Sequence, residues 1–500
     1  MARSITSNKS AFKATLSKRL LFPTWPSNDL PPFFADPATP PELTAEVYDF
    51  IALALRAFVN PWWTKISRYD KEFLPDITRI LTHVFRELEK RVQDTDLAPL
   101  VFHAVPAILT QHYCDYRNAA AKLSSSYASG GALTLPVLFH NLQPHMAVSA
   151  DGTIDAEYMR QIVDQVLKSC LPPDDYDPEP ERYVIREIVL KILLKDVIQK
   201  ITQPWFIQKT ILDLLGQQDV LLTKAQAEGV QSRPSSPSAV STFSFHTLIV
   251  VSLSAIQALS GACLAMIHAY RQAITTIKRV NQTPPRPQPT RRVSSPFPRP
   301  RSPASVPIPT SPVSPSISAS SSVSSWATSP DPSAPSTPPH DTPPRDYALP
   351  ALALLSEMFS TPARMASSSI MHTLSLLLLF FSPFLDRLLP HLLAQVLSPK
   401  ALLMTVRSAK RALFPNGYPA PPPPDPTPEE QAQMRARLLA YRGKSPWVEV
   451  HILPLVLGSD PTETLAAALD PLTSRECNVH LVILLLDCII GTLFPELLGE

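Results

Sequence analysis

Apolar residues recur at helical spacing along the first 215 residues, and prolines or short polar stretches separate the blocks that they form. Because residues three and four apart share one face of a helix, each block predicts an amphipathic helix with one buried side. The predicted helices cover residues 41–58, 77–88, 97–123, 156–171, 181–201 and 205–215, with Thr44 as a plausible cap, Asn60-Pro61 as a break and residues 124–156 irregular. No alternating strand pattern competes with them, so this part predicts an all-α domain.

The last third of the chain returns to the same pattern. Helices are predicted to resume at residue 348, to fill residues 370–397 with breaks near Pro383 and Pro390, and to follow at 402–413 and 428–441. A final helix within residues 478–498 is apolar on nearly every side, contains the single acid Asp487 and ends at Pro495. A helix of this kind packs inside a protein, with its acid hydrogen-bonded or at the rim.

Two apolar stretches are long enough to raise the question of a membrane span. Residues 247–267 carry no charge, but polar residues such as Ser254 and Gln257 form a thin stripe, which favours a helix packed on protein over a transmembrane helix. Residues 370–397 contain Asp386-Arg387 and two prolines, which shorten the uninterrupted apolar part. An integral membrane protein is therefore the less favoured alternative.

The proline content divides the chain into folded and unfolded parts. The chain has 57 prolines, and residues 281–346 consist mostly of Pro, Ser, Thr and Arg with few large aliphatic side chains. Such a segment cannot bury enough apolar area to offset the entropy lost on ordering, so it is predicted to be disordered. The predicted organisation is a flexible N-terminal tail (1–41), a helical domain (42–216), a linker (217–245), an apolar helix (246–280), a disordered Pro/Ser/Arg-rich linker (281–346) and a second helical domain (347–500).

The disordered linker carries sequence features typical of regulation. Its Ser-Pro steps and the block Arg291-Arg292-Val293-Ser294 are typical of kinase substrates, and its Pro-x-x-Pro steps are weak matches to ligands of SH3 domains. The candidate phosphorylation sites are Ser294, Ser295, Ser302, Ser311 and Ser314. The alternative is a passive spacer with no regulatory role.

Charge and cysteine usage exclude several classes of protein. Lys and Arg total 45 against 43 Asp and Glu, and the net charge of +2 is far too small for a whole-chain nucleic-acid binder. The five cysteines lie far apart, as expected for reduced cysteines of an intracellular protein. The first 21 residues have no signal-peptide core, and their basic amphipathic pattern favours a disordered tail over membrane-surface contact.

The sequence contains no motif for catalysis or for a cofactor. A dinucleotide-binding glycine motif, a phosphate loop, a zinc-protease motif and a serine-hydrolase elbow are all missing from it. The acidic run 175–181 imitates alternate calcium ligands, but Pro180 and Arg186 stand where a calcium loop needs Gly and Glu, so a solvated loop is expected. Histidines such as His112 lack metal-ligand spacing. We therefore expect no enzyme, no metal and no cofactor.

The first helical domain carries a set of blocks in a fixed order. These are Phe58-Val59, Trp62-Trp63, Ile66-Ser67, Phe73, His112 with Tyr116, Glu157-Tyr158-Met159-Arg160, Leu171-Pro172-Pro173-Asp174, Ile185-Arg186-Glu187-Ile188 and Ile201-Thr202-Gln203-Pro204-Trp205-Phe206-Ile207. In these blocks, residues 47–215 resemble the PX-associated (PXA) domain of some sorting nexins. One departure is His145-Met146-Ala147-Val148, where the family has His-Pro-Ala-Leu.

The second helical domain resembles the sorting nexin C-terminal (nexin C) domain over residues 348–498. The matching blocks are Ala412-Leu413-Phe414-Pro415-Asn416-Gly417, Thr427-Pro428-Glu429-Glu430 with Arg435, residues 453–458, and the final run from Asn478 through Leu-Leu-Asp to Leu-Phe-Pro-Glu-Leu. Related proteins often carry a PX or RGS domain between the two. The Pro/Ser/Arg-rich interval leaves no room for either, so a PX-type phosphoinositide pocket is not expected.

In related proteins the two domains are thought to dock into one helical module with an apolar cavity for lipid acyl chains. The resemblance therefore implies a non-enzymatic protein that binds or transfers phospholipid, or tethers membranes, at the cytoplasmic side of endosomal, vacuolar or endoplasmic reticulum membranes. Helices that are apolar all round supply the candidate cavity residues Leu377, Leu378, Phe381, Leu484, Leu485 and Ile489. The alternative is a sorting or tethering adaptor without lipid cargo, controlled by phosphorylation of the linker.

Overall fold

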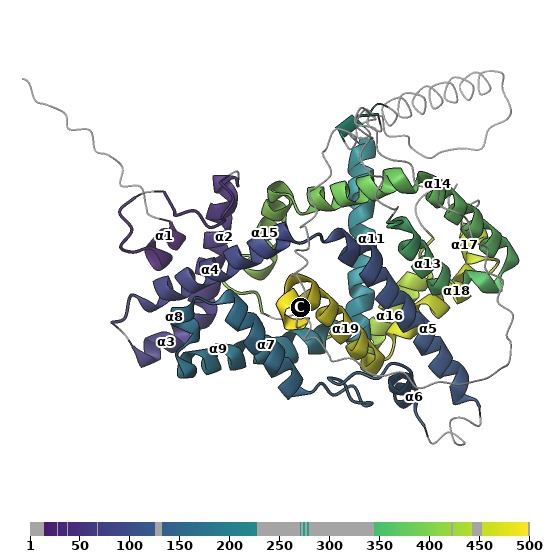
Figure 1. The fold of residues 1–500 in the computed structure, drawn as a ribbon, viewed down its shortest axis with the longest axis horizontal. Coiled ribbons are helices and arrows are strands. Elements are labelled where there is room, and N and C mark those ends of the chain that lie inside the picture. The colour runs from purple at the N-terminus through teal and green to yellow at the C-terminus, as the bar shows by residue number, and fades with distance from the viewer. Residues whose placement is uncertain are drawn as a thin grey trace, which may run out of the picture. The chain divides into compact units, whose positions relative to one another are not determined.

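Helices and loops make up the described part of the chain in a computed structural model (Figure 1). The structure describes residues 15–27, 29–37, 39–67, 69–125, 133–227, 345–421, 424–442 and 453–498, together with the single positions 271, 274, 275, 278 and 279. Within these residues two isolated β-bridges, between residues 145 and 154, are the only extended pairing. The predicted all-α fold is confirmed. The linker 281–346 up to residue 344, with its candidate phosphorylation serines, lies outside the described residues.

The N-terminal half, residues 15–227, is a series of helices joined by short loops. Its α-helices are α1 (Leu16–Leu21), α2 (Pro41–Ala54), α3 (Asn60–Ile66), α4 (Phe73–Asp94), α5 (Val105–Leu123), α6 (Leu135–Leu142), α7 (Ala156–Cys170), α8 (Pro173–Tyr176), α9 (Glu179–Lys191), α10 (Gln199–Ile201) and α11 (Pro204–Ala227). Of the three π-helical turns, η1 (Leu55–Val59) joins α2 to α3 and η4 (Ile192–Ile198) joins α9 to α10 without a loop, whereas η2 (Leu100–Ala104) follows a short loop and leads directly into α5.

The C-terminal half, residues 345–498, is helical in the same way. Its helices are α13 (Ala348–Met358), α14 (Met365–Val396), α15 (Pro399–Leu413), α16 (Pro428–Leu439), α17 (Leu453–Leu457), α18 (Pro461–Leu469) and α19 (Arg475–Leu493), with 3₁₀ turns η5 (Thr361–Ala363), η7 (Asp470–Leu472) and η8 (Pro495–Leu498). Thr427 and Glu430 form a reciprocal capping box at the start of α16, as acids near a helix N-terminus favour.

The two halves belong to one compact unit. That unit comprises residues 1–253 and 344–500, whereas residues 254–343 form a second unit. In the second unit the structure describes five helical positions, and the Thr275 hydroxyl donates to the Arg271 carbonyl at 2.8 Å. The predicted apolar helix 246–280 otherwise lies outside the described residues.

The structure differs from the predicted flexible tail over residues 1–41. Residues 15–37 fold back on α2, and Leu21 and Phe33 are buried against Tyr48, Ile51 and neighbouring residues. The Phe33 ring meets the Tyr48 ring edge-on, with centroids 5.2 Å apart. The sequence pattern did not predict this packing, because a Pro-rich stretch has no helical or strand periodicity and can still place single aromatic side chains in a core.

Several predicted helix boundaries are wrong, because a proline lies at a helix start where a break was predicted and because helices extend through stretches predicted to be irregular. Asn60-Pro61 does not end a helix but opens α3, directly after the π-turn η1, where a missing proline N–H leaves no intrahelical bond unmade. Thr44 lies inside α2, whose N-cap is Pro40. The predicted irregular region contains α6, and α11 extends eleven residues into the predicted linker 217–245.

Pro383 and Pro390 do not break the helix predicted over residues 370–397. Both lie inside α14, which is continuous over 32 residues. A proline in a helix interior removes one hydrogen bond and pushes the preceding turn aside, so a continuous helix bends instead of stopping. Figure 1 shows α14 changing direction along its length.

The acidic run 175–181 is also less solvated than predicted. Asp175, in α8, is buried, and both of its carboxylate oxygens accept hydrogen bonds from the Arg79 guanidinium of α4, at 2.9 and 3.1 Å. The sequence indicated neither the short helix α8 nor the distant arginine that anchors it.

The two halves share one hydrophobic core, with α19 at its centre. Val479 and Ile483 of α19 are buried against Met159, Val163 and other residues of the N-terminal half. Cys477, two residues before Val479, joins a second buried cluster formed by Ala119, Leu138 and Phe139 of α5 and α6. Figure 1 shows the yellow helix α19 among the blue and teal helices of the N-terminal half. The helix is hydrophobic on nearly every side because protein surrounds much of it.

Ion pairs join the halves away from this core. Arg407 and Lys410 of α15 both contact the Glu46 carboxylate of α2, and the hydrogen bond from Lys410 holds the pKa of Glu46 below its ordinary value. Near the end of the chain, Arg91 of α4 pairs with Glu496 at 2.8 Å and lies over the Phe494 ring. These contacts fix α15 and the end of the C-terminal half on the N-terminal half.

Candidate functional site

Three features of the described residues are candidates for function: the polar groups of α19 in the shared core, the outward face of α14, and the exposed face of α9. Asn478 of α19 is fully buried, and its side-chain N–H₂ donates to the carbonyls of Thr202 and Leu472, both at 3.0 Å. Buried amides of this kind fix the register of one element against another, because a shifted helix would leave them unpaired.

Asp487 takes part in a polar cluster with His145 and Tyr158. The Tyr158 hydroxyl donates to Asp487 Oδ2 at 3.0 Å, and His145 Nε2 lies 2.9 Å from the same oxygen. His145 Nδ1 accepts from the Ala147 N–H at 3.1 Å, so Nε2 carries the proton that His145 donates to Asp487. Burial, followed by the nearby Asp487, raises the pKa of Tyr158 to about 12. The predicted hydrogen bonding of Asp487 is confirmed. Through these contacts the cluster holds α19 against residues 145–158.

Two histidines lie inside the core beside α19. His112 and His480 are buried, and their ring centroids lie 5.3 and 5.5 Å from the centroid of the Phe139 ring. Burial lowers the pKa of each histidine to about 4. His112 Nε2 lies 3.2 Å from the Pro471 carbonyl, so neutral His112 donates there. His112 is therefore a buried core residue with a partner at Nε2, whereas its Nδ1 has none. Among the described residues no group of three or more His, Cys, Asp or Glu side chains is placed to hold a metal ion.

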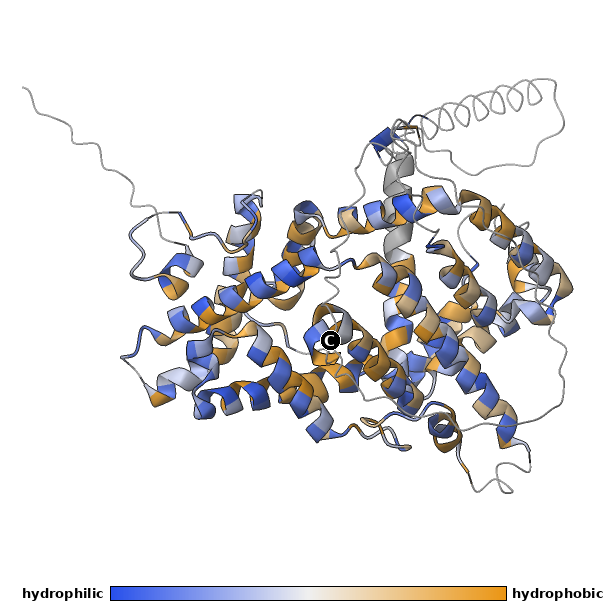
Figure 2. Ribbon diagram, in the orientation of Figure 1, coloured by the Kyte–Doolittle hydropathy of each residue, from blue (hydrophilic) through white to orange (hydrophobic). Residues whose placement is uncertain are grey.

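The helix α14 presents many of its leucines and phenylalanines outward and three of its serines inward. Ser367 and Ser382 are buried and Ser375 is half-buried, all on the side that packs toward the protein. Outward-facing residues of the same turns are exposed: Leu374, Leu376, Leu377, Leu379, Phe380 and Phe381. Phe380 is 78% exposed. Figure 2 colours this stretch of α14 as hydrophobic almost throughout. A surface helix in water has the opposite arrangement, so the outward face of α14 needs an apolar partner.

Asp386 anchors this helix to the start of the C-terminal half. Its carboxylate accepts three consecutive backbone N–H groups, from Arg345, Asp346 and Tyr347, at 2.6, 3.1 and 3.0 Å. The Ser382 hydroxyl donates to the Asp346 carboxylate alongside. The inward side of α14 is therefore polar at Ser382 and Asp386, because these side chains hydrogen-bond to residues 345–347 before α13.

Replacing Asp386 by alanine is expected to lower the free energy of unfolding by about 1–3 kcal/mol, because three backbone N–H groups, two of them in partly buried hydrogen bonds, lose their acceptor. Urea titration followed by circular dichroism would measure this. Asp386→Asn keeps one acceptor oxygen and should lose less. Equal losses for both variants would show that the N–H contacts of Asp386 are not the source of the lost stability.

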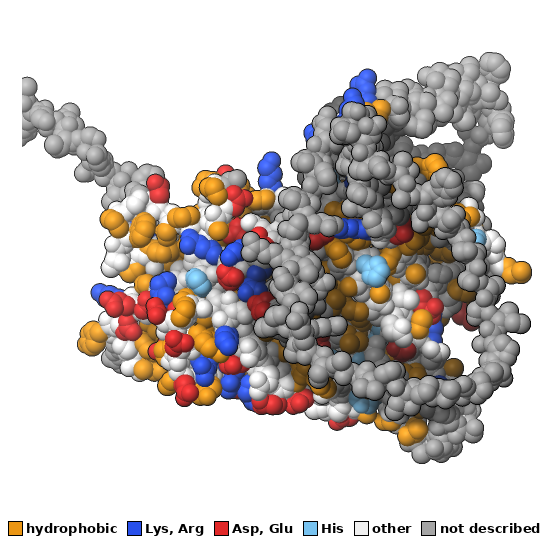
Figure 3. All heavy atoms as spheres, viewed as in Figure 1, with side chains coloured by type: hydrophobic (Ala, Val, Ile, Leu, Met, Phe, Trp, Pro, Cys, Tyr) orange, Lys and Arg blue, Asp and Glu red, His pale blue; other side chains and the backbone are white. Residues whose placement is uncertain are grey.

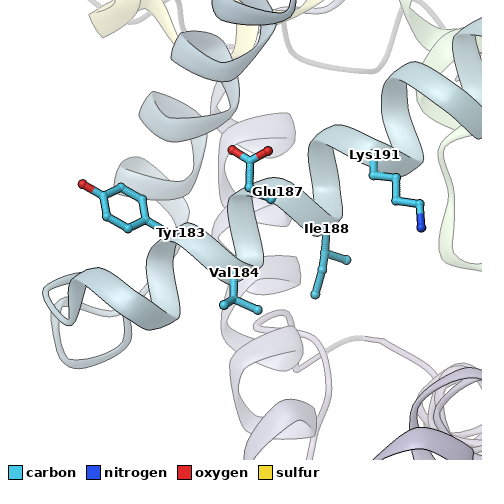
Figure 4. Close-up of a pocket in the computed structure, with 5 residues that line it drawn as sticks. All are labelled: Tyr183, Val184, Glu187, Ile188 and Lys191. Atoms are coloured by element: carbon cyan, nitrogen blue, oxygen red, sulfur yellow. The ribbon is translucent and has the colours of Figure 1, made fainter.

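A second exposed apolar face lies on α9. Tyr183, Val184 and Ile188, with the chains of Glu187 and Lys191, line an open groove of about 450 Å³ (Figure 4). Val184 is 59% exposed and Ile188 49%. Figure 3 shows charged side chains gathered on the left of the visible face, where α3, α8 and α9 lie, with hydrophobic ones between them. This face is narrower than that of α14 and is surrounded by both signs of charge.

The six predicted cavity residues lie on two helices with different surroundings. Leu377 and Phe381 are each 50% exposed on α14, and Leu378 lies in a small crevice against the start of α13, beside Ser382. Leu484 and Leu485 are half-buried on α19, and Ile489 is 40% exposed. That these residues line one lipid cavity stays a prediction. Leu376, Phe380 and Arg387, which share the outward stripe of α14, were missed, although the spacing of Ser367, Ser375 and Ser382 marks the inward side in the sequence.

Two of the described helices are long and apolar enough to cross a membrane, namely α14 and α19. A third of the most apolar stretch of α19 is buried in protein, whereas 6% of that of α14 is. Length and composition give only weak support for a span, and α19 meets the test because it is a core helix.

The fold and these surfaces define an all-α protein whose N-terminal half is completed by a helix from the C-terminal half. Residues 40–214 match the family model of the PXA domain, so the predicted PXA resemblance is confirmed. The likeness of residues 348–498 to nexin C stays a prediction.

Known proteins resemble the chain over this same region. PXA domain protein 1 of Schizosaccharomyces pombe is 28% identical over 173 residues, which cover 35% of this chain and 34% of that protein. Human sorting nexin-13 is 23% identical over 171 residues, 32% of this chain and 18% of that protein, and mouse sorting nexin-19 is 23% identical over 175 residues, 35% and 17%. The match therefore spans about a third or less of the length of these relatives. No solved structure matches the chain.

Proposed function

We propose that this chain is a non-enzymatic, membrane-associated protein of sorting-nexin type that binds phospholipid and acts in membrane trafficking. The single observation that carries the proposal is the outward apolar face of α14. Similarity to sorting nexin-13 and sorting nexin-19 over the PXA domain supports a trafficking role. Endosomal, vacuolar or endoplasmic reticulum membranes, approached from the cytoplasm, are the proposed location.

The physical support is the cost of leaving this face in water. Exposed Leu and Phe side chains such as Leu376 and Phe380 gain about 1.5–3 kcal/mol each when they are fully buried in an apolar environment. Lipid acyl chains supply such an environment without a specific protein partner. The same chemistry suits either the surface layer of a bilayer or the chain of a bound lipid.

Vesicle flotation of the full chain tests the proposal. The double variant Leu376→Ser/Phe380→Ser is expected to lose at least tenfold in vesicle partitioning, because two apolar anchors are removed at about 1.5–3 kcal/mol each. The matched control is Val184→Ser/Ile188→Ser on α9, which has the same four-residue spacing and similar exposure. The control should float like the unmodified protein. Equal loss in both variants, or no flotation of the unmodified protein, would contradict the role of α14.

Mass spectrometry of the purified protein separates lipid carriage from simple membrane binding. A carrier should retain phospholipid after gel filtration, and substitutions at Leu377, Phe381 or Leu485 should reduce the amount. If the protein is free of lipid but still floats with vesicles, the proposed membrane association stands and the proposed lipid transfer is contradicted. A protein that neither floats nor retains lipid would favour the adaptor, whose partners bind the folded halves and whose linker is phosphorylated.

A further inference from the structure

The outward stripes of α14 and α15 combine apolar side chains with cations at the same spacing. On α14 the stripe contains Leu376, Phe380 and Arg387, which are four and seven residues apart and all exposed. On α15, which follows after Leu397-Ser398, it contains Lys400, Met404 and Arg411, again four and seven residues apart and all exposed. Residues at these separations share one face of a helix.

The segment that carries both stripes is unbalanced in charge, although the whole chain is not. Residues 365–424 contain five Lys or Arg and a single acid, Asp386, whereas the whole chain has 45 basic and 43 acidic residues. The Asp386 carboxylate is occupied by the N–H groups of residues 345–347. The surface of this segment therefore carries no uncommitted negative charge among the described residues.

The basic side chains of this segment have two separate roles. Arg407 and Lys410 face the N-terminal half, where Glu42 and Glu46 neutralise them. Arg387, Lys400 and Arg411 take part in none of the ion pairs found among the described residues, and all three are exposed. The cations on the outward stripes are thus available to a negatively charged partner.

We propose that these stripes bind the surface of a membrane that contains anionic phospholipid, with α14 lying in the plane of the membrane. The proposal deepens the proposed function, on which it rests. Leu376, Phe380 and Met404 enter the boundary between headgroups and acyl chains, while Arg387, Lys400 and Arg411 meet phosphate and carboxylate groups. Apolar side chains with Lys or Arg beside them are the signature of a helix at a membrane surface.

The contacts of α14 oppose a membrane-spanning arrangement. Its inward side packs on α13 and α17, and Ser382 and Asp386 are hydrogen-bonded to residues 345–347. Pro383 and Pro390 also interrupt its hydrogen bonds in the middle. A helix held to protein on one side along its length can present only its other side to lipid.

The test measures partitioning of the full chain into phosphatidylcholine vesicles with and without phosphatidylserine. Each cation at an anionic surface contributes about fivefold to binding at low salt, so phosphatidylserine should increase partitioning by up to about a hundredfold. High salt should remove most of this gain. The triple variant Arg387→Gln/Lys400→Gln/Arg411→Gln should lose the gain but keep its binding to phosphatidylcholine alone.

The matched control is Lys65→Gln/Lys71→Gln/Lys209→Gln, which removes three exposed cations outside α14 and α15. This variant should keep the gain from phosphatidylserine. An equal loss in both triple variants would overturn the proposal, since net charge and not the stripes would then carry the binding. Equal binding to both kinds of vesicle would overturn the proposal while leaving the proposed function in place.

Two further outcomes bear on the test. Absence of binding to either vesicle would remove the proposed function together with this inference. Resistance of vesicle-bound protein to alkaline carbonate extraction would overturn the in-plane arrangement in favour of a span.

Discussion

Lowering the pH from 7 to 5 is expected to reduce the free energy of unfolding by about 3–4 kcal/mol. The cause is His112 and His480, each with its pKa lowered to about 4 by burial, against 6.5 in an unfolded chain. Between those two values the unfolded chain binds protons that the native histidines do not. Stability therefore rises with pH in this window and is lost as the pH falls below 6.5, by about 1.4 kcal/mol per pH unit for each histidine.

Urea titrations at several pH values would measure this slope. The variant His480→Leu removes one of the two groups, fills the core with an apolar side chain and should remove about half of the pH dependence between pH 7 and 5. His372, which is exposed on α14, provides the control, because His372→Leu should leave the slope unchanged. A slope that His480→Leu does not alter would show that other groups control the acid sensitivity.

Replacing Ile483 by alanine is expected to reduce the free energy of unfolding by about 2–5 kcal/mol, because the side chain is fully buried in the core that both halves share. The same substitution at Ile489, 40% exposed on the same helix, should cost less than about 1 kcal/mol. The pair separates the loss of core packing from the change in helix propensity, because both changes are Ile to Ala in α19.

Because the core is shared, we expect both halves of the Ile483→Ala variant to unfold together. Probes in the two halves, for example Trp62 fluorescence in the N-terminal half and amide exchange of α18, should report the same midpoint of unfolding. A variant in which the C-terminal half unfolds first while the N-terminal half keeps its stability would contradict the dependence of the N-terminal core on α19.

Much of the candidate site could be predicted from the sequence, and there is a physical reason why the rest could not. The apolar run of α14 was visible, and so was the single acid of α19. Whether such a run faces core, lipid or solvent depends on which side the neighbouring helices cover. The spacing of a few serines can indicate the inward side of α14, but it does not show what lies against the other side. Ser382 lies on the inward side because its hydroxyl donates to the Asp346 carboxylate, a contact that the sequence did not indicate.

The sequence by itself determined the all-α class, the extent of the PXA domain and the helical nature of the last third, because these depend on local periodicity and on motifs of adjacent residues. Only the tertiary structure decided that α19 completes the N-terminal core and that α14 turns its leucines outward. The first outcome depends on contacts between residues hundreds of positions apart, such as Tyr158 with Asp487 and Asn478 with Thr202. The second depends on contacts of α14 with residues about 40 positions earlier, such as Asp386 with the Tyr347 N–H. Local sequence fixes the helices, but the burial of each helix is set by what lies against it.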